Sequence, residues 1–112
     1  MKYTVYGTSY EVELVFSSYA TNGATAIQLM SDEEGPIATA TVNPVDEEFD
    51  RMVKKDGGHR FVCIKDYSEN EGMTQFLMEN NVIKPDLIAS LPSGFVLLGV
   101  FELTEEYAKQ AV

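Results

Sequence analysis

Apolar and polar residues alternate through the first third of the chain, which is the pattern of strands that bury one face. Between Tyr10 and Phe16, apolar side chains take every second position, and Glu11 and Glu13 fall between them. This period of two predicts a half-buried strand with both carboxylates in water. Asn22-Gly23 predicts a hairpin turn, because both residues tolerate positive φ. Further strands are expected over residues 2–6, 24–30 and 37–42, which makes this part a four-stranded antiparallel meander.

Residues 44–59 have a different character, and two interpretations fit them. Pro44 cannot donate to a sheet ladder, so the meander is expected to end there. Apolar residues recur at helical spacing over residues 46–55, with acids early and lysines late, as the helix dipole favours. Gly57-Gly58 would end such a helix. The segment is therefore either a short helix or a mobile excursion.

A capping motif marks the best-defined helix. Ser68-Glu69-Asn70-Glu71 matches the box in which a Ser hydroxyl accepts from the N3 amide and the N3 Glu reaches back. An apolar stripe at helical spacing follows it. The sequence therefore predicts a helix over about residues 69–81, preceded by a strand over residues 60–65.

The last strong element is a strand over Phe95 to Leu103. Its near-continuous apolar run predicts a central position covered on both faces. Thr104 is expected to cap a short helix over residues 105–110. A length of 112 residues fits one domain. The fold class expected for residues 1–112 is α+β, an antiparallel sheet of five or six strands with one packed helix.

The most informative feature of the composition is its negative charge. The chain has 18 acidic residues against 8 Lys and Arg, a net charge of −10. Nine of these acids lie between Tyr3 and Asp50, where no Lys or Arg occurs. Charge of one sign attracts cationic surfaces and repels nucleic acid and anionic lipid. We therefore expect neither direct nucleic-acid binding nor membrane binding.

Residues suited to catalysis or metal binding are scarce. The only His is His59, beside two glycines, and the only Cys is Cys63, inside an apolar strand. Nucleophilic catalysis needs a nucleophile, a base and an orienting group in fixed geometry. We therefore expect no catalytic residues, no metal site and no cofactor. One cysteine excludes an intramolecular disulfide, and the start of the sequence lacks an apolar leader, so a cytoplasmic protein is expected.

The candidate partner-binding residues are the clustered carboxylates and two tyrosines. They are Asp32, Glu33, Glu34, Asp46, Glu47, Glu48, Asp50, Glu69, Glu71, Tyr6 and Tyr67. Solvated turns are the competing interpretation of the acidic runs. Glu71 is also explained by the capping box, and Glu69 also suits a helix N-terminus. Tyrosine is enriched at interface hot spots. Tyr6 falls on the opposite face from Tyr3 and Val5, which favours its exposure.

Three pieces of the sequence occur together: Tyr19 and Asn22 leading into Ala26-Ile27-Gln28-Leu29, then Ala38 to Asn43, and then Tyr67 to Gly72 with a later Pro92-Ser93-Gly94-Phe95. In this combination the chain resembles a family of small, functionally unassigned proteins of plasmids, conjugative elements and phages of gut and Gram-positive bacteria. The resemblance implies an accessory protein of a mobile element, acting in a bacterial host cell, and it brings no catalytic residues. In size and acidity the chain is also similar to anti-CRISPR, anti-restriction and other DNA-mimic proteins.

Three functions follow as hypotheses. The first is a non-enzymatic inhibitor whose acids form one rigid patch against the basic surface of a nucleic-acid-handling protein, such as a Cas9-type effector. The second is a mobile-element accessory protein acting as a protein-binding module or homodimer, through exposed tyrosines and a free sheet edge, with acidity serving solubility. The third, a small enzyme, would need His59 or Cys63 in an enclosed pocket.

A basic cluster interrupts the acidic field in the middle of the chain. Its members are Arg51, Lys54, Lys55, Arg60 and Lys65. These side chains either pair with neighbouring acids or touch nucleic acid at the edge of a complex.

Overall fold

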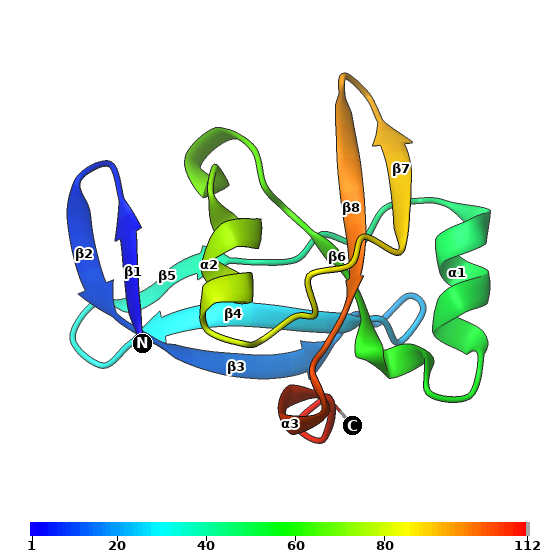
Figure 1. Ribbon diagram of the computed structural model, residues 1–112, viewed down its shortest axis with the longest axis horizontal. Helices are drawn as coiled ribbons and strands as arrows, with labels where there is room; N and C mark the ends of the chain where they lie inside the picture. Colours follow the sequence, from blue (N-terminus) through cyan, green and yellow to red (C-terminus); the bar gives the residue numbers. More distant parts are fainter. Residues whose placement is uncertain (112) are drawn as a thin grey trace.

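The computed structural model describes residues 1–111 and has an α+β fold (Figure 1). Within these residues there are eight strands: β1 (Lys2–Val5), β2 (Thr8–Glu11), β3 (Glu13–Ser18), β4 (Thr25–Ser31), β5 (Gly35–Thr39), β6 (Phe61–Ile64), β7 (Ala89–Ser93) and β8 (Val96–Glu102). The helices are α1 (Glu47–Lys54), α2 (Met73–Glu79) and α3 (Glu105–Ala108), with 3₁₀ turns at Gly58–Arg60 and Ser68–Asn70. Over the same residues, no helix has the length and apolar character needed to cross a bilayer.

The expected single sheet is divided into three antiparallel sheets. They are the β1–β2 hairpin, a sheet in the order β3-β4-β5, and a sheet in the order β6-β8-β7. One isolated bridge between Thr41 and Ile64 connects the two three-stranded sheets. It is flanked by the hydrogen bonds from Lys65 N to Ala40 O (2.9 Å) and from Val42 N to Cys63 O (3.0 Å).

The division begins at Val12, where the sequence predicts an unbroken strand. β2 pairs with β1, whereas β3 pairs with β4, so the chain changes partner between Glu11 and Glu13. At the change, the buried Val12 donates its amide to Met1 O (2.8 Å). Alternation of apolar residues continues through such a change, which is why the pattern alone predicts one strand.

Two clusters of buried side chains form the core. The larger lies between β4, β6, β8 and α2, where Tyr3 meets Phe76 edge to face at 4.9 Å between ring centroids. The smaller lies between α1 and the opposite face of the β6-β8-β7 sheet, where Phe49 packs with Cys63 and Leu98. The core therefore lies on both faces of this sheet.

α2 begins at Met73 and not at residue 69, so the predicted capping box is wrong. Asp66 supplies the contacts instead, because its carboxylate accepts from the amides of Gly72 (2.7 Å) and Thr74 (3.1 Å). Ser68 lies in a separate 3₁₀ turn at φ 54°. The 3₁₀ turn is held against the end of β5, because the side-chain amide of the buried Asn70 donates to Thr39 O (2.7 Å).

Residues 44–59 are ordered around a helix, which decides between the two interpretations. Asp46 is the N-cap of α1, and its carboxylate accepts from the Phe49 amide (3.0 Å). After the helix, Gly58 lies so close to the carbonyls of Met52 and Val53 that a Cβ would overlap them. A glycine is therefore required where the chain turns back towards β6.

β8 has the central position that its apolar run predicts, but only part of it is covered on both faces. Phe101, near the body of the molecule, is buried, whereas Leu97 is 73% exposed and Phe95 is fully exposed. The β7–β8 hairpin extends away from the rest of the chain at the top of Figure 1.

Candidate functional site

The first acidic cluster lies on the turn between β4 and β5. Asp32, Glu33 and Glu34 are all exposed there. The hydroxyl of Ser31 accepts from the amides of Glu33 (3.3 Å) and Glu34 (3.2 Å), and Gly35 provides the positive φ of 78° that closes the turn. The three carboxylates therefore project from a turn with a defined backbone.

A surface cavity of about 410 Å³ extends this cluster to a neighbouring strand. Glu11 of β2 lines it together with the turn acids, so four carboxylates surround one space. Glu11 accepts from the amino group of Met1 at 2.9 Å and is the paired member of the four. The sequence predicted Glu11 to face water but did not join it to the turn, because that requires the strand pairing.

The second acidic cluster lies on α1. Glu47 and Glu48 are exposed on its first turn. Asp46 and Asp50 are only half exposed and have structural contacts, Asp46 as the cap and Asp50 as the acceptor of a 3.0 Å hydrogen bond from the Asn22 side chain. Two of the four predicted acids are therefore directed to solvent, and the other two hold the helix in place.

The basic cluster divides into paired and unpaired members. Arg60 contacts Glu102 at 3.3 Å, and Lys65 contacts Glu69 at 2.8 Å. Arg51 and Lys54 lie on α1 beside its acids, yet within residues 1–111 neither they nor Lys55 form an ion pair. α1 therefore presents a mixed surface, acidic at its start and basic at its end.

Tyr6, Glu69 and Glu71 come together around a cavity of about 350 Å³ between the β1–β2 turn and the Ser68–Asn70 turn. Tyr6 is 86% exposed and has a φ of 48°. The hydrogen bond from Lys65 lowers the pKa of Glu69 and raises the pKa of Lys65. Tyr67 is absent from this cavity lining: it packs against the smaller core cluster, and Lys65 Nζ lies 5.6 Å from its ring centroid.

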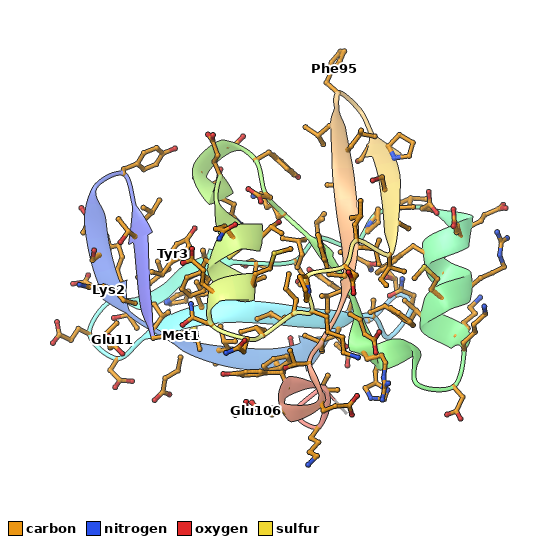
Figure 2. The ribbon with its side chains drawn as sticks, viewed as in Figure 1. Met1, Lys2, Tyr3, Glu11, Phe95 and Glu106 are labelled. Carbon is orange, nitrogen blue, oxygen red and sulfur yellow. The ribbon has the colours of Figure 1, made fainter. Side chains whose placement is uncertain are left out.

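The acids do not form the single patch that the inhibitor hypothesis expects. In Figure 1 the β4–β5 turn lies at one end of the long axis, below the β1–β2 hairpin, and α1 lies at the other end. The Cα atoms extend over 37 Å along this axis. Figure 2 labels Glu11 at the first end and Glu106, on α3, apart from both clusters. The negative surface is thus divided between two ends of one molecule.

The two residues considered for catalysis lie in different surroundings. Cys63 is buried, and this burial, with a smaller contribution from Asp46, raises the pKa of its thiol to about 12. The thiol is therefore protonated and is no nucleophile at neutral pH. His59 lines an open cavity of about 590 Å³ beside Asp56, Arg60 and Glu102. Over residues 1–111, no three His, Cys, Asp or Glu side chains are arranged to hold a metal ion.

In comparisons with protein-family models, with curated proteins and with solved structures, none matches this chain.

Proposed function

We propose that the chain is a non-enzymatic inhibitor that occupies the cationic nucleic-acid groove of a bacterial defence protein, with carboxylates in the place of phosphates. The observation that carries this proposal is a set of exposed acids without an ion-pair partner within residues 1–111. They are Asp32, Glu33 and Glu34 on the β4–β5 turn, and Glu47 and Glu48 on α1. Because these carboxylates hold no Lys or Arg of their own chain, they are available to a partner's guanidinium and ammonium groups.

The positions of the two clusters support a partner that contacts the molecule along its length. The two clusters lie towards opposite ends of the folded molecule, whose Cα atoms extend over 37 Å along its long axis. A duplex presents the same groove again after one turn, about 34 Å along its axis. A protein that follows a duplex can therefore place its cationic contacts about one turn apart. Two acidic clusters at opposite ends of this molecule fit such contacts better than they fit one compact basic pocket.

A Cas9-type effector is the proposed target, because it holds a heteroduplex and a displaced strand in positively charged channels. This choice depends on the resemblance to mobile-element proteins and on analogy in size and acidity. Any nuclease with a cationic channel of that length offers the same contacts.

The test is binding to the purified effector at low and high salt, together with neutralising variants. The triple variant Asp32→Asn, Glu33→Gln, Glu34→Gln removes one cluster, and Glu47→Gln with Glu48→Gln removes the other. Each is expected to weaken binding by roughly tenfold or more, and raising the salt is expected to weaken the binding of the wild-type chain. Competition with target DNA is expected as well, because both would occupy one groove.

A matched control removes two exposed acids outside the clusters, Asp86→Asn with Glu106→Gln. This control changes net charge as much as the α1 variant does, so a specific contact predicts that it binds like the wild-type chain. If the control and both cluster variants lost affinity equally, net charge alone would explain the binding. An affinity that is the same at low and high salt would overturn the proposal.

The alternative function, a protein-binding module, is favoured by a different observation. The β7–β8 hairpin exposes Leu97 and Phe95 in a chain that otherwise carries a strong charge. Exposed apolar patches of this kind mark interaction surfaces. Acidity would then serve solubility, and association through this surface would not weaken with salt.

A further inference from the structure

The β7–β8 hairpin has one buried face and one uncovered face. β7 and β8 pair in the register Pro92 with Leu97 and Leu91 with Leu98. Leu91 and Leu98 are buried against α1 in the smaller core cluster. Because side chains alternate along a strand and paired residues share a face, Pro92 and Leu97 lie on the opposite face. Both are exposed.

Neighbouring apolar side chains extend the uncovered face in both directions. Leu87 reaches this side, because its Cδ1 lies 3.3 Å from a Cβ built on Gly99, which shares the side of Leu97 on β8. Ile88 follows it immediately before β7. Both are among the exposed large apolar residues. Phe95 occupies the turn after Gly94, and Figure 2 shows it at the tip, directed away from the rest of the chain.

The segment that carries this face has no ionisable side chain. From Leu87 to Phe101 the sequence contains no Asp, Glu, Lys, Arg or His, although the whole chain has 18 acids. Two identical molecules of net charge −10 repel each other at most approaches. At this hairpin they can meet without placing carboxylates from the contacting segment against each other.

From these observations we propose that the uncovered face of the β7–β8 hairpin packs against the same face of a second copy of this chain in a two-fold dimer. Strand addition at β7 is disfavoured, because Pro92 has no amide hydrogen to continue a ladder. The contact is instead face to face. In an isologous interface each apolar side chain is buried twice, once in each copy.

The area available agrees with a dimer of modest stability. Leu87, Ile88, Leu97 and Phe95 leave on the order of 500 Å² uncovered, so two copies would bury on the order of 1,000 Å². Specific interfaces begin at about that size. The sequence pattern supports the same conclusion. The near-continuous apolar run of β8 is typical of a strand covered on both faces, whereas the monomer covers only one face of the outer half of β8.

The test is sedimentation of the purified chain over a range of concentrations at low and high salt. We expect a monomer–dimer equilibrium that shifts towards dimer as salt is added, because salt screens the repulsion between the two acidic copies. Binding to a cationic target is expected to weaken with salt, so the two proposals fail independently. A chain that remains monomeric in every condition would overturn the dimer and leave the face to a different partner.

Substitutions locate the contact. Leu97→Glu places two like charges at the two-fold contact and is expected to weaken dimerisation by at least roughly tenfold. Phe95→Ser, at the tip, is a second variant that does not touch the strand. The control is Val45→Ser, which removes a fully exposed apolar side chain outside the hairpin and is expected to leave the equilibrium unchanged. A dimer that survives both hairpin substitutions would contradict the proposal.

Discussion

Phe101 packs directly over Gly99, two positions earlier on the same strand. A Cβ built on Gly99 would lie 2.8 Å from Cε1 of the Phe101 ring and 3.3 Å from Cδ1 of Leu87. The absent side chain leaves room for the Phe101 ring, which is buried in the larger core cluster. This pair also marks the boundary on β8 between the covered half and the exposed half.

Gly99→Ala is therefore expected to destabilise the fold, although alanine normally suits a strand better than glycine does. The ring and the Leu87 side chain would both have to move, and overpacking of this kind costs about 1–3 kcal/mol of the free energy of unfolding. Denaturant unfolding measures the change. Ser90→Ala, at the exposed position paired with Gly99, is the control and is expected to change little. An unchanged midpoint for Gly99→Ala would show that the ring adapts without cost.

The start of α2 gives a prediction that separates the sequence interpretation from the structure. Asp66→Ala removes the acceptor of the Gly72 and Thr74 amides and is expected to cost about 1–2 kcal/mol of the free energy of unfolding. Ser68→Ala, which the capping box predicts to be equally harmful, is expected to change stability by less than about 0.5 kcal/mol. Thermal and denaturant unfolding of the two variants decide between them. A larger loss for Ser68→Ala would restore the capping box.

The buried thiol gives a pH dependence with a defined sign. Cys63 has a pKa of about 12 in the folded chain, whereas an unfolded thiol has a pKa of about 8.5. Stability from this group is fully present below the unfolded pKa and is lost as the pH rises towards the folded pKa. The free energy of unfolding is expected to fall by up to about 1.4 kcal/mol per pH unit above pH ~9. Burial also raises the pKa of Tyr3, so measurements between pH 8 and 10 isolate the thiol best.

Two comparisons test this assignment. Cys63→Ala is expected to reduce the loss of stability over that range. Iodoacetamide at pH 8 is expected to label the wild-type chain only after denaturation, because the folded thiol is both protonated and inaccessible. Rapid labelling of the native chain would mean that Cys63 is less buried than its contacts indicate.

Much of the local structure could be predicted because it depends on neighbouring residues. The strands around residues 24–30 and 60–65, and helices near residues 46–55 and 105–110, follow from periodicity and end signals. Long-range partners were not predictable in the same way. Asn22 illustrates this. The β3–β4 hairpin turns through Asn22 and Gly23 as expected. The sequence did not indicate that the Asn22 side chain also donates to Asn43 and Asp50 and so holds the loop to α1.

The candidate site shows the same limit. The sequence identifies which carboxylates are numerous and close in the chain, and Asp32, Glu33 and Glu34 are indeed exposed together. The sequence does not reveal the strand pairing that brings Glu11 beside these three acids. It also does not reveal the hydrogen bond from Asn22 that gives Asp50 a structural role. The exposure of Phe95 and Leu97 was also hidden, since an apolar run has the same appearance whether its second face is covered by the same chain or left open.

Tyr6 and Gly7 form the two-residue turn between β1 and β2, and both have positive φ, 48° and 81°. Asn-Gly is the sequence that this turn type prefers, because a bulky side chain is strained there. The Tyr6 side chain is exposed, so its burial does not offset the strain of the positive φ. Strained residues of this kind cluster at functional sites, and this one lines the cavity with Glu69 and Glu71.

Tyr6→Asn is accordingly expected to make the chain more stable and a weaker binder. Relief of strain in the turn predicts a gain of about 0.5–1 kcal/mol in the free energy of unfolding. Because Tyr6 is one of the candidate partner-binding residues, loss of its exposed ring is expected to weaken target binding by roughly fivefold or more. Denaturant unfolding and a binding titration on the same preparation measure both. Tyr6→Phe is the control, since it keeps the ring and the strain, so its stability should match the wild-type chain. A less stable Tyr6→Asn variant would show that the turn is not strained, and unchanged binding would remove Tyr6 from the interface.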